Sequence, residues 1–375
     1  MGGPDQVRDL VQLLPNLRLP NHEEKSHAKG STMKQAVMTA PGKISFAEMP
    51  TPEIKPDEAL VQMIRIGVCG SDIHVFHGKH PYTSYPVVQG HEVSGVIEKV
   101  GAEVTEYKKG DHVTVQPQLV CGTCYACTHG AYHICDNLKV MGFQTTGAAS
   151  EYFAVSAAKL VKLPTGMSMD FGAMVEPTSV AVHALSRSGS VEGKAVLVLG
   201  GGPIGNLVAQ SARGLGARKV MITDVSNYRL GIARQCGLEL CVNPNETDLA
   251  ATVAREFGPD RPDLILECVG SNQTTEQAIQ NARKGTDIII VGVFGQKATV
   301  DLGLVQDREL RIIGTLMYQE KDYKKAVELI TAEKVNLSPL VTNHFPFERY
   351  LEAYRFIDEK KDQTMKVIID MQQEV

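Results

Sequence analysis

The sequence predicts an α/β protein with two domains, one β-rich and one built on a doubly wound parallel sheet. The chain has 375 residues, enough for two domains at a typical size of about 150 residues. Up to about residue 161, apolar and polar residues alternate with the period of half-buried strands. From about residue 193, short and wholly apolar segments alternate with helical stretches, which is typical of a parallel sheet covered on both faces.

The expected elements follow in chain order. Residues 1–32 carry balanced charges and prolines that interrupt the leucines, and we expect a disordered extension there. A helical stretch begins near Glu176 and runs through residue 185. The tail reads as helix, strand and helix. The predicted strands are 60–68, 93–100 and 112–116, then 195–199, 220–223, 264–266, 288–291 and 310–313, and the tail helices are 323–331 and 347–358.

Composition excludes several function classes. The formal net charge is −5 and no run of Lys or Arg stands out, so we expect no nucleic-acid partner. No apolar run approaches the ~18 residues of a membrane span, and we expect no membrane partner. The first residues lack the basic and continuous apolar regions of a secretory signal. A cytoplasmic protein is therefore expected.

A glycine motif, residues 200–205, follows the first apolar strand of the second region. Gly200 suits a tight turn, Gly202 leaves room for a pyrophosphate, and Gly205 permits close packing. Pro203 and Ile204 open the helix whose free N–H groups attract an anion. The motif predicts dinucleotide binding, and an ordinary glycine-rich turn between strand and helix is the alternative.

An acidic residue follows the glycine motif at the spacing of a ribose ligand. Asp224 lies 19 residues after Gly205, at the end of the next predicted strand. Its carboxylate suits both hydroxyls of the NAD ribose and would repel the extra phosphate of NADP. Arg229 lies nearby and offers a partner for that phosphate. We expect NAD, with NADP as the alternative.

Four of the eight cysteines fall within fifteen positions, with spacing C-x2-C-x2-C-x7-C. Four thiolates in one polar loop are typical of a closed tetrahedral zinc site, which leaves no position for a substrate. A redox dithiol or buried unreactive cysteines are the alternatives. The pattern predicts a structural zinc held by Cys121, Cys124, Cys127 and Cys135.

A second set of metal-ligand types is dispersed along the β-rich region. Cys69 ends an apolar strand, and His91 and Glu92 enter another. Thiolate, imidazole and carboxylate are each zinc ligands, although a core cysteine and a polar pair at a strand edge explain them equally well. Glu176 lies in an apolar setting at the start of a helix. There it either binds a cation or metal, or it interacts favourably with the positive end of the helix dipole.

In combination, these motifs resemble the zinc-containing medium-chain dehydrogenases from Met33 onward, most closely the sorbitol (polyol) dehydrogenases. The resemblance implies a GroES-like catalytic domain, residues 33–183 and 318–375, and a Rossmann NAD-binding domain, residues 184–317. It implies a catalytic zinc on Cys69, His91 and Glu92. Glu176 would lie beside that zinc, ligating it directly or through water. The four clustered cysteines match the second zinc of the family, which some sorbitol dehydrogenases lack.

The resemblance also implies a reaction. A secondary alcohol would give its hydride to NAD and become a ketone, with zinc as the Lewis acid. Ser71 matches the hydroxyl that relays the proton. His74 either extends that relay or packs near the cofactor. Phe143, Thr145 and Thr146 would line the substrate site.

Two positions depart from the polyol pattern: Val75 follows His74, where the polyol group has Tyr, and Met317 precedes Tyr318, where it has Arg. A threonine-type 3-hydroxy amino acid dehydrogenase is therefore the second candidate. A nucleotide-binding protein without turnover and a zinc-free quinone reductase are rivals, and both should lack the Cys, His and Glu set. The family association of parallel sheets edge to edge implies a homodimer or homotetramer, with residues 288–300 near the contact.

Overall fold

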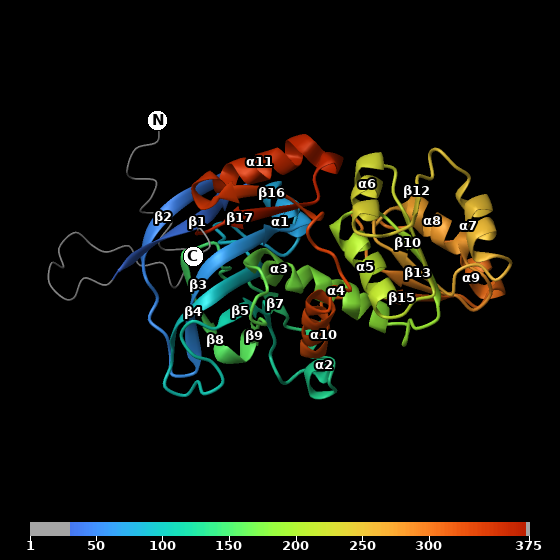
Figure 1. Cartoon of the computed structure of the whole chain (residues 1–375). Helices are drawn as coiled ribbons and strands as arrows, with labels where there is room; N and C mark the ends of the chain where they lie inside the picture. The colour runs from blue at the N-terminus through green and yellow to red at the C-terminus, as the bar shows by residue number, and fades with distance from the viewer. Residues whose placement is uncertain (1–30, 373–375) are drawn as a thin grey trace.

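The computed structural model describes residues 31–372. The predicted extension, residues 1–32, lies outside the described residues except for its last two, and Thr32 already opens a strand. Figure 1 shows a β-rich body beside a body whose parallel strands are flanked by helices. The mixed α/β fold predicted from the sequence is confirmed.

The β-rich body is built on a seven-stranded sheet with the order β16-β17-β3-β4-β5-β9, in which β8 also pairs with β3. A hairpin and a short two-stranded sheet accompany it. The sheet strands are β3 (Glu58–Val68), β4 (Glu92–Val100), β5 (His112–Val115), β8 (Tyr152–Ser156), β9 (Leu160–Lys162), β16 (Val341–Pro346) and β17 (Lys366–Asp370). The others are β1 (Thr32–Ala40) with β2 (Lys43–Pro50), and β6 (Gln118–Leu119) with β7 (Lys139–Val140).

Strand β17 brings the end of the chain back to this sheet, where it pairs antiparallel with β3. The sequence predicted helix, strand and helix for the tail and did not include this last strand. Its segment is only five residues long, and periodicity does not separate so short an apolar run from a helix end. Pairing with β3 makes this segment a strand, because β3 is buried along nearly its whole length and its backbone needs hydrogen-bond partners on both edges.

The second body is a six-stranded sheet with the order β12-β11-β10-β13-β14-β15, in which every pairing is parallel. The order is that of a doubly wound sheet, with the first strand at the centre. The predicted strands match β10, β11, β13, β14 and β15 within one residue at each end. The strands are β10 (Ala195–Leu199), β11 (Lys219–Thr223), β12 (Leu240–Val242), β13 (Leu264–Glu267), β14 (Asp287–Ile290) and β15 (Arg311–Gly314).

Helices cover both faces of the parallel sheet and cap the β-rich body (Figure 1). The α-helices are α1 (Gly70–Phe76), α2 (Tyr125–Thr128), α3 (Met169–Ala173), α4 (Val175–Ser186), α5 (Pro203–Gly214), α6 (Asn227–Gln235), α7 (Leu249–Phe257), α8 (Asn272–Asn281), α9 (Leu302–Asp307), α10 (Glu320–Thr331) and α11 (Tyr350–Lys360). The short 3-10 helices are η3 (Tyr132–Ile134), η4 (Ala157–Lys159), η5 (Phe347–Arg349) and η6 (Lys361–Gln363). No helix in the described range is both long and apolar enough to span a bilayer.

Helices α4 and α10 join the two bodies. Helix α4 contacts β4 and β5 on one side and α5 on the other. Tyr323 and Leu329 of α10 pack in the same buried cluster as Val196 of β10 and Leu207 of α5. The predicted boundaries after residues 183 and 317 run through this shared core, and they stay a prediction.

Candidate active site and zinc centres

Cys69, His91 and Glu92 come together at one end of β3 and β4. Cys69 follows β3 and is the N-cap of α1. Glu92 opens β4 opposite Gly67 in the antiparallel register. The ligand atoms of the three side chains all lie within 4.8 Å of one another. Strand pairing therefore assembles a group that sequence spacing left as separate residues.

Two glycines make room for this group. A Cβ at Gly67 would collide with the Glu92 carboxylate, which lies directly over that backbone. Gly90 has φ +95°, and its missing side chain faces Ala149 and Ile66. A side chain at Gly90 would be strained and crowded, so the turn that delivers His91 needs glycine.

Buried polar groups surround His91. Its Nδ1 lies 3.5 Å from Asp72 Oδ1 and makes no hydrogen bond within residues 31–372. Asp72 accepts hydrogen bonds from the Cys69 backbone N–H at 2.9 Å and from Gln89 Nε2 at 3.0 Å. Burial lowers the pKa of His91, but the Asp72 carboxylate and the Cys69 thiol outweigh burial and raise it well above its ordinary value. Asp72 thus stabilises a positive charge at this imidazole.

Lys366 of β17 is the cation of the site. Its Nζ lies 2.5 Å from Glu92 Oε2 and donates to the Val68 carbonyl at 3.3 Å. Both side chains of the ion pair are at most 3% exposed. A buried carboxylate and a buried ammonium each need such a partner, because neither is tolerated alone in a core.

Glu176 lies near this group without belonging to the cluster of three. It is buried on α4, and the Tyr318 hydroxyl donates to its Oε1. Burial raises the pKa of Glu176 to about 7, and the Glu92 carboxylate adds to the rise. A carboxyl group poised near neutrality can hold or release a proton there. Tyr318, noted in the sequence beside Met317, therefore belongs to this site.

The other predicted residues lie on α1 and in the loop that contains Phe143. Ser71 is half-buried and His74 is exposed on α1, with Val75 fully buried behind them. The Phe143 ring packs against His91 with a centroid separation of 4.9 Å. Thr145 has a buried hydroxyl without a hydrogen-bond partner in the described range, and Thr146 is exposed.

The four clustered cysteines form a second centre in the loop around α2. Their sulfur atoms lie within 4.8 Å of one another. Backbone N–H groups lower the pKa of Cys121 to about 5, whereas burial and the neighbouring thiols raise that of Cys127 to about 12. Four thiolates this close together would repel one another, and a bound cation would relieve that repulsion.

The glycine motif lies at the carboxyl end of β10, where the chain turns into α5. Pro203 and Ile204 are the first two residues of α5. Gly200 has φ +104°, and a Cβ at Gly205 would collide with the Gly200 carbonyl oxygen. The next strands, β11 and β13, lie on opposite sides of β10. This is the switch point at which doubly wound sheets bind their ligands.

Asp224 lies beside this motif after β11. Its two carboxylate oxygens accept backbone N–H bonds from Gly201 and Ser226, each at 2.7 Å. Arg229 Nη1 lies 3.8 Å from Asp224 Oδ2 and 4.0 Å from the position of a Cβ on Gly202. Each carboxylate oxygen keeps a further lone pair for a hydroxyl group.

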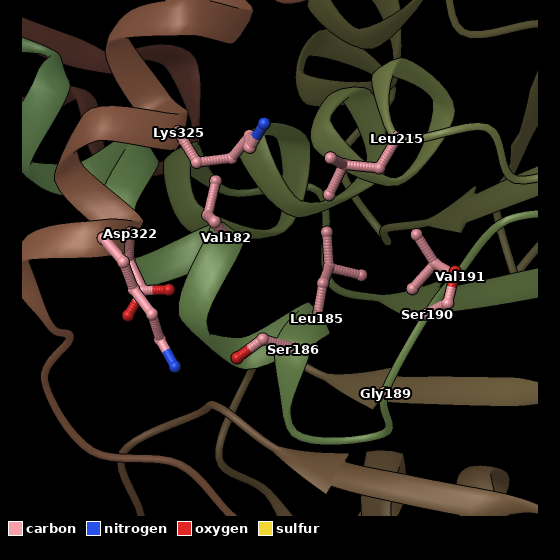
Figure 2. Close-up of a pocket in the computed structure, with 10 residues that line it drawn as sticks. Val182, Leu185, Ser186, Gly189, Ser190, Val191, Leu215, Asp322 and Lys325 are labelled. Carbon is pink, nitrogen blue, oxygen red and sulfur yellow. The ribbon is translucent and has the colours of Figure 1, made fainter. Parts of the chain in front are cut away.

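A cavity of about 330 Å³ lies elsewhere, between α4, α5 and α10. Figure 2 shows Val182 and Leu185 facing Leu215 and Val191 across it, with Lys325 at one side. None of the predicted site residues lines this cavity, and we assign it no part in the chemistry.

Both metal-ligand groups fit zinc. Zinc in proteins binds thiolate, imidazole and carboxylate, with four protein ligands in structural sites and three in open catalytic sites. The four-thiol loop matches the first pattern and the Cys69, His91 and Glu92 group matches the second. The unpaired Nδ1 of His91 faces the carboxylate of Asp72, as metal-binding histidines commonly do.

Comparison with known proteins shows the class. Residues 55–165 match the family described as "Alcohol dehydrogenase GroES-like domain", and residues 203–332 match "Zinc-binding dehydrogenase". The chain belongs to the zinc-dependent medium-chain alcohol dehydrogenase family, as the sequence motifs predicted. It is an oxidoreductase of the NAD(P)-binding type.

Several similar proteins are named as dehydrogenases of sugar derivatives or polyols. The chain is 36% identical to 2-dehydro-3-deoxy-L-galactonate 5-dehydrogenase of Pseudoalteromonas atlantica, over 81% of this chain and 89% of that one. It is 32% identical to human sorbitol dehydrogenase, over 89% and 94%. The crystal structure of galactitol-1-phosphate dehydrogenase from Escherichia coli superimposes with a TM-score of 0.84 at 33% identity, over 90% and 100%.

Sequence reasoning missed several residues of the site. Asp72 carried a signal, because it stands three residues after the N-cap Cys69, where an acidic side chain caps a helix. Gln89 and Tyr354 carried none, although Tyr354 donates to Gln89 Oε1 at 3.0 Å. Lys366 stood out only as a charge preceding the apolar segment 367–369.

Proposed function

We propose that this protein oxidises a secondary alcohol of a polyol or sugar derivative to a ketone, with zinc and NAD. The convergence of Cys69, His91 and Glu92 next to the buried Glu176 carries the proposal. The names of the relatives support the substrate class, since they include a sugar acid, a polyol and a polyol phosphate.

The roles of the side chains follow from their chemistry. Zinc held by Cys69, His91 and Glu92 would supply a Lewis acid that makes the substrate hydroxyl more acidic, while NAD would take the hydride from the same carbon. Asp72 faces the second ring nitrogen of His91 at 3.5 Å and would orient the imidazole toward the metal. Ser71, at the start of α1, receives the substrate proton and passes it toward the exposed His74.

Glu176 has a separate role. Burial raises the pKa of Glu176 to about 7 in the metal-free site, so its carboxyl group can hold a proton there until a cation displaces it. The Tyr318 hydroxyl fixes one of its oxygens, so the other is the one available to zinc or to a bound water.

The cofactor proposal is NAD rather than NADP. Asp224 is held by the backbone N–H groups of Gly201 and Ser226, with its charge beside Gly201. A 2′-phosphate at that place would meet this fixed negative charge at close range. Arg229 already faces Asp224 at 3.8 Å, so its charge is partly neutralised.

The four-cysteine centre is proposed to hold a second, structural zinc. It ties the loop around α2 to the segment near η3, where Tyr132 accepts the Glu320 backbone N–H at 2.7 Å. The loop thereby supports the start of α10, immediately after Tyr318.

We further propose a homodimer or homotetramer formed through β15, the edge strand of the parallel sheet. Ile312 on β15 is 39% exposed, and Val293, Leu302 and Leu316 nearby in the fold are each more than half exposed. An unpaired, apolar sheet edge of this kind is a template for pairing with another chain. Light scattering of wild type and Ile312→Lys tests this, and a monomeric wild type contradicts it.

A cytoplasmic location completes the proposal. All eight cysteines lie in the described range and all are unpaired, as expected of a reducing compartment.

The test of the function is NADH formation, measured by absorbance across polyols, sugar acids, cyclitols and threonine. We expect turnover with polyols or sugar derivatives and loss of turnover after zinc removal. Threonine as the best substrate would favour the second candidate. NAD binding without turnover of any alcohol would favour a non-catalytic nucleotide-binding protein.

A further inference from the structure

A loop next to the predicted zinc site carries an imidazole that the proposed reaction does not use. His80 follows α1, and its ring stacks on the Phe143 ring with centroids 4.8 Å apart and planes 25° apart. The other neighbour of Phe143 is the zinc-ligand candidate His91, at 4.9 Å. One aromatic ring therefore separates His80 from the metal-ligand group.

The His80 ring is held in place from several sides. The Thr83 hydroxyl and His80 Nδ1 share a hydrogen bond of 2.7 Å. The edge of the Tyr82 ring faces His80 at 6.2 Å. Gln144, next to Phe143, donates to the Tyr82 carbonyl at 3.3 Å and joins the two loops. A ring fixed by stacking and by one nitrogen presents its other nitrogen in a defined direction.

That other nitrogen is Nε2. Within residues 31–372 the only hydrogen bond of the His80 side chain is the one to Thr83. Nε2 can therefore donate or accept, depending on which partner carries the proton in the Thr83 pair. A hydroxyl group suits it in either state, because a hydroxyl both donates and accepts.

The charge of His80 narrows the ligand class. Partial burial lowers the pKa of His80, His74 and His91 act in the same direction, and the Asp72 carboxylate opposes them in part. Zinc at the predicted site would act in the same direction, since it adds positive charge. The lowered pKa favours the neutral ring, which offers a hydrogen bond without a counter-charge for a carboxylate or phosphate.

We propose that His80 is a specificity-determining residue whose Nε2 hydrogen-bonds a second hydroxyl of a neutral polyol, away from the carbon that is oxidised. The inference rests on the proposed function and names the substrate class within it. It also assigns a polar contact to a chain that has Val75 and Met317 where polyol dehydrogenases have polar residues. Stacking on Phe143 holds the His80 ring in place, and Nε2 makes the hydrogen bond to the substrate hydroxyl.

The test compares His80→Phe with wild type on substrates that do and do not carry a second hydroxyl. Phe keeps a flat ring against Phe143 and removes both nitrogens. We expect kcat/KM for xylitol or sorbitol to fall about 10- to 100-fold, as for one lost polar contact, mainly through KM. The monohydric 2-butanol should change less than about threefold. Fructose and butanone make the same comparison in the reverse direction.

Two further variants control for structure. His77→Phe changes an exposed neighbour that pairs with Asp358 at 2.8 Å, and it should leave both substrates unchanged. His80→Gln restores a donor and acceptor near the Nε2 position and should recover part of the loss. An equal effect of His80→Phe on the polyol and on 2-butanol, or no effect on either, would overturn the proposal.

The inference that the substrate is neutral is tested by comparing a polyol with its phosphate ester. Wild type should use galactitol better than galactitol-1-phosphate, and a preference of more than tenfold for the phosphate contradicts the neutral-substrate inference. Such a preference would leave the proposed dehydrogenase function standing. Absence of turnover with every alcohol would instead overturn the function itself, so the two failures are distinguishable.

Discussion

Lys366 Nζ lies 2.5 Å from Glu92 Oε2, in an ion pair that water does not reach. The partners come from β17 and β4, which are separated by 274 residues in sequence. The buried Glu92 carboxylate carries a negative charge next to the Cys69 sulfur and Glu176. Lys366 balances that charge from behind the site.

We predict that Lys366→Met destabilises the zinc-free protein by about 3 to 5 kcal/mol, because it strands the buried Glu92 carboxylate. Added zinc should offset part of the loss by supplying a cation to the same carboxylate. Urea unfolding with and without zinc measures both effects. Lys366→Arg keeps the charge and should behave close to wild type. Equal stability of Lys366→Met and wild type without zinc would refute the charge-balance argument.

Replacing a zinc-ligand candidate should separate chemistry from cofactor binding. We expect His91→Ala to reduce NADH formation by about a thousandfold or more and to lower the zinc content from two per chain to one. NADH binding, followed by the fluorescence of the reduced cofactor, should stay within about twofold, because the glycine motif lies on another sheet. His129→Ala is the matched control, since His129 is exposed and stacks on Tyr125. Normal turnover in His91→Ala would be incompatible with the metal role.

The four-cysteine centre should be dispensable for chemistry and required for stability. Cys124→Ser should remove one zinc and lower the thermal midpoint, because metal binding contributes directly to folding. Activity at low temperature should persist. Cys241→Ser, a thiol outside the cluster, should keep both zincs. A Cys124→Ser protein that still binds two zinc ions argues against this centre.

Asp224→Ser should change the cofactor preference. Loss of the carboxylate removes the ribose contact and the repulsion toward a 2′-phosphate, so kcat/KM should fall about 10- to 100-fold for NAD and less for NADP. The ratio of the two values, taken with one alcohol substrate, is the measurement. Asp248→Ser, which changes an acidic N-cap remote from the motif, should leave the ratio unchanged. An unaltered ratio in Asp224→Ser removes its ribose role.

Acid should loosen the contact between the cysteine loop and α10. The His133 ring packs against His183 at 4.7 Å and accepts from Gln319 Nε2 at 3.0 Å. Burial, with His183 and Arg187 nearby, lowers the pKa of His133 to about 4. The unfolded chain, with a histidine pKa near 6.5, binds more protons between these values, so stability must fall as pH falls from about 6.5 to 4.

The loss is at most about 3 kcal/mol. His133→Asn keeps an acceptor for Gln319 and removes the titration, so its stability should depend less on pH over this interval. Zinc release also occurs in acid, and it affects wild type and variant alike. Unfolding free energies at pH 4.5 and 7 measure the difference, and parallel curves for His133→Asn and wild type speak against this origin.

The sequence by itself determined the fold class, the parallel strands and the clustering of four cysteines. These features are local: five apolar strands in alternation with helices, a glycine turn at one strand end, and four cysteines within fifteen positions. Short-range spacing sets the geometry of each, because a strand, a turn or a metal loop uses neighbouring residues. The resemblance of the motifs to a known family carried the assignment of Cys69, His91 and Glu92.

Tertiary structure alone decided how those residues are supported. The Lys366 partner of Glu92, the Tyr318 partner of Glu176 and the stacking of His80 on Phe143 each join segments that no periodicity connects. Strand β17 is too short to be read from its pattern and is fixed by pairing with β3. Such contacts depend on which strands pair and which loops meet, and that choice is made by burial of the whole chain rather than by local spacing.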